Sequence, residues 1–312
     1  MNLTQLRTFV AIAEAESFVR ARGLYLSQPA ASRQIQALEA SLGVLLFDRL
    51  GRRIKLTPEG EDLLHRGRRL LQEAESFAER ARALKGGQAG TLRVGGSTQH
   101  IESVLADFLP RFKLNHPEVD VDLVEEGGAR VPERLERGDV HLALMTSGDD
   151  AYSYKLLAPV LVLAVVPATH ALARRTTLEI SELTDHPLLL LRRDYASRGW
   201  FDAAAHIKPK VLLESAAPHT LLALARTGRG IALVPSNVSI AQDAVQALPL
   251  VRRRTPIGRW AIVAWDSRRF LPPYGKLFID DLVAFCRDHY PGRDLLRRTS
   301  PLPRPRRASV PG

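Results

Sequence analysis

Cysteine is almost absent from this chain, since Cys286 is the only one among 312 residues. A single thiol excludes a disulfide framework and any metal site that needs several cysteines. It also suits a reducing compartment such as the cytoplasm. No apolar run approaches the ~18 residues of a membrane-spanning helix, and residues 1–15 predict an amphipathic helix rather than a signal peptide. We therefore expect a cytoplasmic protein without a membrane partner.

The motifs of common enzymes are missing as well. The chain has no Gly-x-Ser-x-Gly, no His-Glu-x-x-His and no phosphate-loop Gly-Lys-Ser/Thr. The pair Gly95 and Gly96 lacks the third glycine of a dinucleotide fingerprint, and the nine histidines show no metal-ligand spacing. We expect neither catalysis nor a cofactor nor a metal.

Positive charge is concentrated at the two ends of the chain. Residues 1–90 contain 14 basic and 10 acidic residues, residues 91–290 contain 24 and 23, and residues 291–312 contain 6 and 1. A basic N-terminal region favours contact with phosphate. The Pro- and Arg-rich residues 291–312 predict a disordered basic tail, either solvated or in weak contact with nucleic acid.

Apolar residues at helical spacing predict three short helices at the N-terminus. The first covers residues 2–15, and the second follows Ser17 and carries Phe18, Ala21 and Leu24. The third is capped by Ser27, has Pro29 in its first turn and stops at Gly43. Its inward face is Ala31, Ile35, Leu38 and Leu42. The start and outer face of this helix supply the candidate DNA contacts Ser27, Gln28, Pro29, Ser32, Arg33 and Gln36.

Residues 45–56 predict a basic β-hairpin with its turn at Leu50 and Gly51. Together with the three helices, it forms a winged helix-turn-helix whose third helix enters the major groove of double-stranded DNA. Arg33 is suited to a guanine edge, with a phosphate contact or a solvated side chain as the alternatives. The hairpin arginines would lie on phosphate or in a minor groove, or stay solvated. They are Arg49, Arg52 and Arg53.

A long helix is predicted to start at Thr57 and Pro58 and to run to about Lys85. Large apolar residues recur every seven positions along it, at Leu63, Leu70, Phe77 and Leu84. Small residues follow the first three of them by four positions, at Gly67, Ala74 and Ala81. This pattern is typical of a coiled-coil seam between two copies of the chain. The alternative is an amphipathic helix packed on its own domain.

From Thr91 onward strands alternate with helices, which predicts parallel α/β sheets in two lobes. The predicted strands are residues 91–94, 119–124, 141–145, 160–166, 188–191, 211–214, 231–234 and 260–265. The predicted helices follow residue 98 and cover about residues 131–137, 198–205, 220–227 and 276–289.

The combined spacing of these motifs resembles the LysR family of bacterial transcription regulators. The elements that carry the resemblance are Ser-Gln-Pro-Ala at 27–30, Ile-x-x-Leu-Glu at 35–39, Leu-Gly-x-x-Leu-Phe-x-Arg at 42–49 and Leu-Thr-x-x-Gly at 56–60. The likeness extends over residues 91–290. It implies a DNA-binding domain at 1–58, a dimerisation helix at 59–89, and an effector domain at 90–290 similar to a two-lobed, type 2 periplasmic binding protein. It places lobe I at 90–162 and 267–290 and lobe II at 163–266.

The resemblance also implies partners and a mechanism. We expect an operator in double-stranded DNA, a homodimer or homotetramer, contact with RNA polymerase, and a small-molecule effector that closes the two lobes. One departure stands out, because the second helix at Val19–Leu24 is one residue shorter than the family pattern. A binding module with impaired DNA binding is therefore the alternative function.

Polar residues that follow strands outline the expected effector site. Gly95 and Gly96 lead from a strand into a helix start, whose free N–H groups and hydroxyls suit a carboxylate or another anion, with plain helix capping as the alternative. Further polar residues follow other strands, and Arg198 or His219 could pair with an acidic ligand. The candidate effector contacts are Ser97, Thr98, Gln99, Thr146, Ser147, Tyr195, Ser197, Arg198 and His219.

Overall fold

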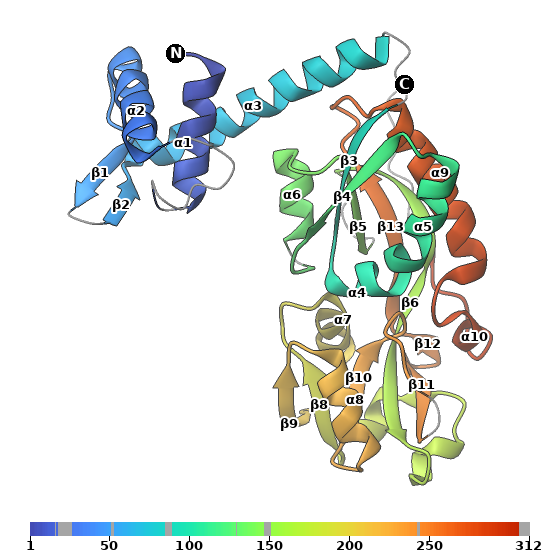
Figure 1. The fold of residues 1–312 in the computed structure, drawn as a ribbon. Coiled ribbons are helices and arrows are strands. Elements are labelled where there is room, and N and C mark those ends of the chain that lie inside the picture. Colours follow the sequence, from blue (N-terminus) through green and yellow to red (C-terminus); the bar gives the residue numbers. More distant parts are fainter. Residues whose placement is uncertain are drawn as a thin grey trace. The chain divides into compact units, whose positions relative to one another are not determined.

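The structure is a computed structural model that describes residues 1–15, 17, 27–50, 53–84, 89–128, 130–146, 151–241 and 244–305. The chain divides into two compact units, Met1–Gly86 and Gly87–Gly312, and each is considered by itself. The N-terminal unit contains α1 (Leu3–Ala15), α2 (Gln28–Leu42), β1 (Phe47–Leu50), β2 (Arg53–Leu56) and α3 (Pro58–Leu84) (Figure 1). The predicted second helix lies outside the described residues.

Helix α2 is the predicted third helix and packs by its apolar stripe. Ala31, Ile35 and Leu38 are buried at helical spacing, and Gly43 ends the helix in the left-handed conformation. Two details of the prediction are wrong. The Ser27 side chain makes no cap hydrogen bond, so the start depends on its extended backbone and on Pro29. Leu42 is exposed because it is the last helical residue, where the chain turns away from the core.

Two polar side chains join α2 and α3 to the hairpin. The Glu39 carboxylate accepts hydrogen bonds from the backbone N–H groups of Leu46 and Phe47, at 2.8 and 3.3 Å. Thr57 caps α3 as predicted, since its Oγ1 accepts from Gly60 N at 2.9 Å, and it donates to Leu45 O at 2.7 Å. A Cβ on Gly60 would lie 2.2 Å from the Leu46 carbonyl oxygen. These contacts fix the entry of the hairpin.

The hairpin pairs Phe47 with Leu56 and Leu50 with Arg53 in antiparallel register. Leu50 therefore lies in a strand and not in the turn, which corrects the predicted turn position. The register shifts because the pairing continues to Leu50, so that only residues 51 and 52 connect the strands. Both connecting residues lie outside the described part of the chain.

Helix α3 packs on its own unit in its first half and exposes large apolar residues further on. In its first half Gly67 is buried against α1, and a Cβ there would lie 3.1 Å from the Leu6 side chain. Leu63 packs on the same apolar cluster. Gly67 therefore admits α1 rather than a partner helix, which corrects the predicted role of that position and favours the own-domain alternative there. Further on, Leu70 and Phe77 are 50% and 78% exposed.

The second unit consists of two lobes, each built on its own sheet (Figure 1). Lobe I contains β3 (Gly90–Gly96), α4 (Thr98–His100), a π-helical segment (Ile101–Leu105), α5 (Ala106–Asn115), β4 (Val119–Glu125), α6 (Val131–Arg137), β5 (Leu142–Thr146), β13 (Gly258–Trp265) and α9 (Pro273–His289). Its strand order is β4-β3-β5-β13, followed by the first part of β6 (Ser153–Pro167).

Lobe II is formed around the second part of β6. It contains β7 (Leu178–Glu179), β8 (Pro187–Leu191), α7 (Ala196–Ala204), β9 (Lys210–Ser215), α8 (Pro218–Arg226), β10 (Ile231–Pro235), β11 (Val245–Arg252), β12 (Thr255–Pro256) and 3-10 segments at Ala171–Arg174 and Ile180–Leu183. Strands β10 and β11 flank β6, and β8 and β9 continue the sheet beyond β10. The sequence pattern did not predict β7, β11 or β12.

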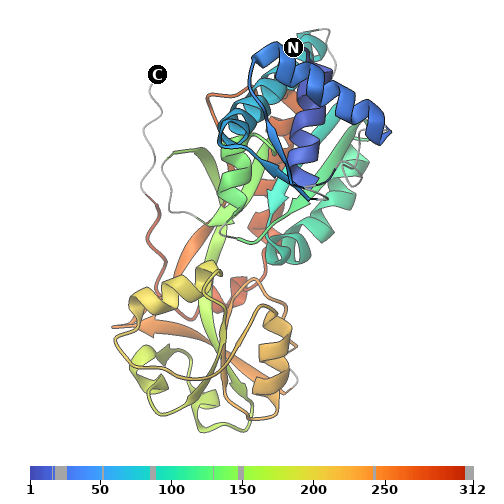
Figure 2. The same ribbon diagram turned by 90° about the vertical axis from the view of Figure 1, so that its left-hand side faces the viewer.

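Two strands connect the lobes, and neither is parallel to its neighbours. Strand β6 begins in lobe I and continues into lobe II (Figure 2), and β13 runs antiparallel to β6 and β5. The predicted parallel pairing is confirmed for β3 with β4 and β5, and for β8 with β9 and β10. It is wrong for β6 and β13, because a strand that returns from one lobe to the other runs opposite to the strand that left. The chain re-enters the lobe I sheet at Gly258, earlier than the predicted Ser267. The likeness to a periplasmic binding protein stays a prediction.

The residues from 291 to 305 lie against the lobe II core through a few apolar side chains. A short helix, α10 (Arg293–Leu296), packs Leu295 and Leu296 on that core, and Leu302 is buried in it. The Trp260 indole N–H donates to Pro303 O at 3.0 Å. The basic, proline-rich composition predicted disorder, and this prediction is wrong for these residues. Their few apolar side chains pack on an apolar surface at the start of β13.

Candidate nucleic-acid interface and ligand pocket

The outer face of α2 presents the predicted DNA contacts to solvent. Ser27, Gln28 and Pro29 at its start are exposed, as are Arg33 and Gln36 one and two turns later. Ser32 is half-buried. Arg33 makes no ion pair with any residue that the structure describes, so its guanidinium is available to a partner. The helix thus offers a free arginine and two amides on one face.

The hairpin arginines are placed only in part. Arg49 lies on β1 and Arg53 on β2, but their side chains, like the whole of Arg52, lie outside the described part of the chain. Lys55 on β2 is described and exposed. The roles of the three arginines in phosphate binding stay predictions.

A pocket lies between the two lobes, where the strand ends of one face the helix starts of the other. Its cavity volume is about 60 Å³, and with the solvent-open space around it the hollow measures about 540 Å³. Five of the predicted effector contacts line it, namely Ser97, Gln99, Thr146, Tyr195 and Ser197. Five of the nine residues predicted from the sequence therefore lie together at one pocket.

Two helix starts meet at this pocket, one from each lobe. Ser97 and Gln99 belong to the start of α4, which continues without a break into α5, and Ala196 and Ser197 belong to the start of α7. The first N–H groups of a helix have no partner within the helix and carry its positive dipole end. Neither the Ser97 nor the Tyr195 side chain makes a cap hydrogen bond. The pocket can therefore offer backbone donors from both sides.

The walls between these helix starts are largely apolar. Leu144, Met145, Val160, Trp200 and Pro235 contribute them. Within the described chain, no lysine or arginine lines the pocket. An anion bound there would be held by dipoles and hydroxyls rather than by an ion pair.

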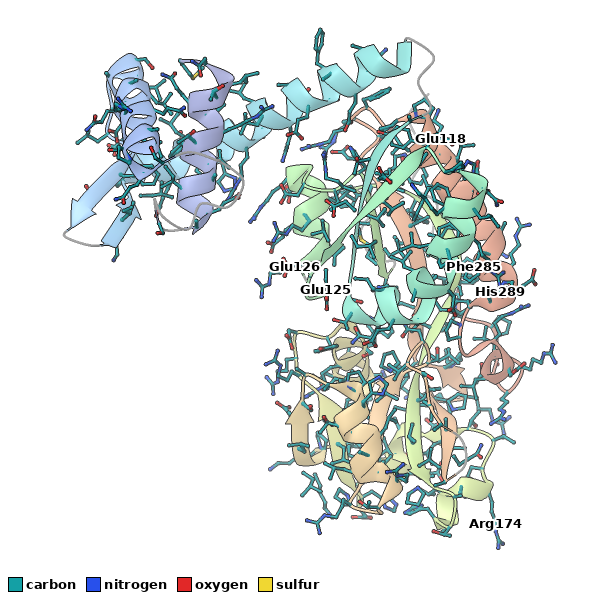
Figure 3. The ribbon with its side chains drawn as sticks, in the orientation of Figure 1. Glu118, Glu125, Glu126, Arg174, Phe285 and His289 are labelled. Carbon is teal, nitrogen blue, oxygen red and sulfur yellow. The ribbon has the colours of Figure 1, made fainter. Side chains whose placement is uncertain are left out.

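Four predicted contacts remain, and the three that the structure describes, Thr98, His219 and Arg198, do not line the pocket. Ser147 lies outside the described residues. The Thr98 hydroxyl donates to Glu125, which lies at the end of β4 beside Glu126 (Figure 3). The exposed His219 lies with its Nε2 3.9 Å from the Glu102 carboxylate. These neighbours direct both side chains toward carboxylates instead of toward a ligand.

Arg198 is the fourth, and its surroundings make it a structural residue. It is 5% exposed and bonds to Asp202 at 2.9 Å, Glu214 at 2.6 Å and the Leu191 carbonyl oxygen at 2.9 Å. Burial alone would lower the pKa of Arg198, but the hydrogen bonds to Asp202 and Glu214 raise it overall. Its charge is already balanced within lobe II, so the predicted pairing with an acidic ligand does not fit.

The pocket also contains polar residues that sequence reasoning missed, above all His100 and Asn237. The sequence offered no reason to select His100, because it lies in a helix start without a distinguishing pattern. Asn237 was not selected either, because it follows β10 outside any motif. Both are buried, at 6% and 4% exposure. Their common feature is tertiary, and no local pattern in the chain predicts it.

Family models match nearly the whole chain. Residues 3–61 match the bacterial regulatory helix-turn-helix protein of the lysR family, and residues 85–287 match the LysR substrate binding domain. The first match extends across residues 19–24, where the sequence is one residue shorter than the family pattern. None of the described helices is long and apolar enough to cross a membrane.

Individual relatives agree with these models. The regulator IlvR of Caulobacter vibrioides is 31% identical over 265 residues, which cover 80% of this chain and 88% of IlvR. Full-length CbnR, solved in complex with its target DNA, is 26% identical with a TM-score of 0.61, covering 95% of this chain and all of CbnR. A full-length variant of OxyR from Pseudomonas aeruginosa has the same fold, with a TM-score of 0.70 at 23% identity, covering 93% of this chain and 98% of OxyR.

Fold, pocket and family matches thus lead to one assignment. The chain has the helix-turn-helix unit and the two-lobed effector unit of DNA-binding transcription regulators, and it belongs to the LysR family.

Proposed function

We propose that this LysR-family regulator changes its DNA binding when a small anion, most simply a carboxylate, occupies the pocket between its lobes. The convergence of two helix starts on one pocket carries the proposal. Backbone N–H groups at helix starts stabilise negative charge without a basic side chain. The apolar walls around Leu144 and Trp200 suit the body of an organic acid.

Closure of the lobes is the step that would transmit binding. The pocket draws its lining from both lobes, so a ligand that touches both favours the arrangement in which they are closest. Binding can shift that equilibrium only by the difference in affinity between the open and closed arrangements. The shift would alter how paired subunits are arranged on DNA, and with it DNA bending and contact with RNA polymerase.

On the DNA side we propose that α2 enters the major groove, with Arg33 on a base edge and Gln28, Ser32 and Gln36 beside it. That the related CbnR was solved in complex with its target DNA supports DNA binding by this chain. Paired subunits would associate through the exposed part of α3, where Leu70 and Phe77 are unburied. The predicted seam from Leu63 to Leu84 is then limited to the residues beyond Gly67.

We further propose that the protein acts in the cytoplasm and catalyses no reaction of its own. Its relatives are transcription regulators, and DNA is their partner. Thiol chemistry is not supported either, because Cys286 is 2% exposed and burial raises its pKa to about 12. A buried thiol with so high a pKa forms little of the reactive thiolate.

A thermal-shift titration tests the anion. Benzoate should raise the melting temperature of the full chain, and benzyl alcohol, of similar size but uncharged, should not. Replacing Ala196 with proline removes one donor at the first helical position, where proline is tolerated, and should weaken benzoate binding about tenfold. The control Ala196→Gly keeps the N–H and should bind like the wild type. Stabilisation by neutral compounds alone would refute the anion.

A further inference from the structure

The chain crosses between the lobes a third time after Tyr290. This residue belongs to lobe I, where it is 2% exposed and packs in the core together with α9. Helix α10 follows, and its Leu295 and Leu296 pack on the lobe II core instead. Figure 1 shows α10 beside the junction of the two lobes. The match to the LysR substrate binding domain ends at residue 287, so this crossing lies beyond the part that the family shares.

The junction that the tail passes is a hinge formed by Leu161, Ser236 and Gly258. At Leu161, strand β6 pairs with Gly258 of the lobe I sheet, and from there on it pairs with β10 and β11 of lobe II. Ser236 N donates to Leu161 O at 2.8 Å, and Leu161 N donates to Ser236 Oγ at 3.0 Å. A change in the angle between the lobes bends the backbone here, because β6 passes from one sheet to the other at this point.

Gly292 places the tail backbone directly against this hinge. It has a φ of +81°, in the left-handed region that favours glycine. A Cβ added to it would lie 2.7 Å from Ser236 O and 3.0 Å from Ser236 Cβ. No room for a side chain is left between the tail and Ser236, so Ser236 cannot move toward the tail without displacing it.

The tail meets the hinge again at Leu302. This side chain is 7% exposed, and its Cδ1 would lie 3.1 Å from a Cβ added to Gly258. Immediately beyond it, the Trp260 indole N–H on β13 donates to Pro303 O at 3.0 Å. The tail therefore touches the hinge once before α10 and once after it, and α10 itself is held by the lobe II core.

Proline makes the tail stiff between these contacts. Four prolines lie next to the two contacts, namely Pro291, Pro301, Pro303 and Pro305. Proline fixes its own φ and restricts the residue before it, so proline-rich segments behave as semi-rigid spacers. Such a segment also has few conformations to lose when it docks. The tail therefore resists a displacement of one lobe instead of absorbing it.

We propose that residues 290–305 form a brace that holds the two lobes at one angle and has to loosen before the lobes can move. Lobe movement matters for the pocket, because its cavity of about 60 Å³ has room for only a few water molecules. A larger ligand can enter only when the lobes separate, so the brace limits access to the pocket. The inference goes beyond the proposed function, since it holds whichever molecule the pocket binds.

The distance between the lobes tests the brace without any ligand. Nitroxide labels are attached to two exposed positions, Asp107→Cys on α5 of lobe I and Ala203→Cys on α7 of lobe II. The native Cys286 is 2% exposed and stays unlabelled. The full chain is diluted with unlabelled protein, so that pulsed electron paramagnetic resonance measures the distance distribution within single chains.

Gly292→Ala is the first variant, since it loosens the tail at Ser236 and keeps every anchoring side chain. The wild type should give one narrow distance. In the variant a second, longer distance should gain about tenfold in population, because a strained residue that also clashes shifts an equilibrium by about that factor. The control Gly228→Ala has the same left-handed strain, at a φ of +75°, but a Cβ there meets nothing within 4 Å. Its distance distribution should match that of the wild type.

Trp260→Phe tests the other end of the brace. It removes the indole N–H that binds Pro303 and keeps an aromatic ring in place. The longer distance should again gain population, by a smaller factor than in Gly292→Ala, because one neutral hydrogen bond is lost without a clash. The control is Trp265→Phe on the same strand, whose ring packs on the lobe I core. It should leave the distance distribution unchanged.

Removal of residues 291–312 should give the largest gain of all, with circular dichroism to check that the shortened chain folds. If it does not fold, the two point variants decide. Identical distance distributions in the wild type, Gly292→Ala and Trp260→Phe would overturn the brace. Equal changes in Gly292→Ala and Gly228→Ala would also overturn it, because backbone strain away from the hinge would then act as strongly. No ligand is added, so each of these results leaves the anion proposal as it stands.

Discussion

The DNA-reading face of α2 and the pocket between the lobes are built in opposite ways. The first takes all its candidate contacts from residues 27–36, which one helix exposes side by side. The second collects residues between Ser97 and Asn237 from two lobes and buries several of them. Polar groups on the helix stay solvated, whereas polar residues of the pocket such as Ser97, His100 and Asn237 are buried.

This contrast leads to different expectations for mutations. Changes on the outer face of α2 should alter DNA affinity and leave stability alone. Changes at buried residues that contact distant segments of the chain should mainly lower the free energy of unfolding. The largest effect is therefore expected in a buried core, and the smallest at a single helix cap.

Leu302→Asp should destabilise the second unit most, by about 4 kcal/mol, because it places a charge in the lobe II core. Leu302 is 7% exposed, and its side chain lies close to Gly258 at the start of β13. Urea unfolding of the full chain measures the loss. Arg304→Ala, which removes only an exposed guanidinium 5.9 Å from the Trp260 ring, should cost less than about 1 kcal/mol. An unchanged transition in Leu302→Asp would mean that the tail does not belong to the core.

His100 should make stability depend on pH. Burial lowers its folded-state pKa from 6.5 to about 4, so between these values the unfolded chain binds the proton more readily. Stability is therefore fully present above pH 6.5 and is lost as the pH falls toward 4, by on the order of 3 kcal/mol. Unfolding of wild type and His100→Leu over this range measures the effect. Parallel pH profiles of the two proteins would contradict it.

Arg33→Ala should weaken specific DNA binding by about 2 kcal/mol and relax discrimination at one base pair. The melting temperature should not change, because Arg33 is exposed. Fluorescence anisotropy with operator variants measures both quantities, and Arg7→Ala on α1 serves as a control for lost charge. Equal weakening on every DNA sequence would make Arg33 a phosphate contact.

Thr57→Ala should cost about 1 kcal/mol of stability in the N-terminal unit, the usual value of a helix cap. The hydroxyl both caps α3 and donates to Leu45 O. Ser41→Ala, which removes a hydrogen bond only to Leu38 O within the end of its own helix, is the control and should cost less. If both variants lost the same free energy of unfolding, the Thr57 hydroxyl would contribute no more than a hydrogen bond within a helix.

The sequence predicted the features that depend on neighbouring residues and missed those that depend on distant segments. The stripe of Ala31, Ile35 and Leu38 and the cap at Thr57 are properties of neighbouring residues, and both were predicted. The buried position of Leu302 and the pairing of β13 depend on contacts with segments more than 40 residues away, and both were missed. The half-packed α3 lies between these cases, because the heptad spacing cannot tell α1 from a second chain.

The same distinction applies to the pocket. Polar residues at strand ends and in the turns and helix starts that follow them were predictable, because strand ends gather at one edge of a sheet, and five of these residues line the pocket. His100 and Asn237 were not predictable, because their place in the pocket depends on how two lobes formed by distant parts of the sequence come together. Arg198 was misjudged for the converse reason, since its partners Asp202 and Glu214 satisfy it within lobe II.

The central claim is that a ligand in the pocket changes how the protein binds DNA. A footprint of the protein on its DNA tests this claim most directly. The full chain is bound to the DNA upstream of its own gene, with and without a saturating concentration of whichever acid stabilises it most. We predict that the protected region changes in length or position when the acid is present, and that Ala196→Pro suppresses the change. An identical footprint with the pocket saturated would contradict the account.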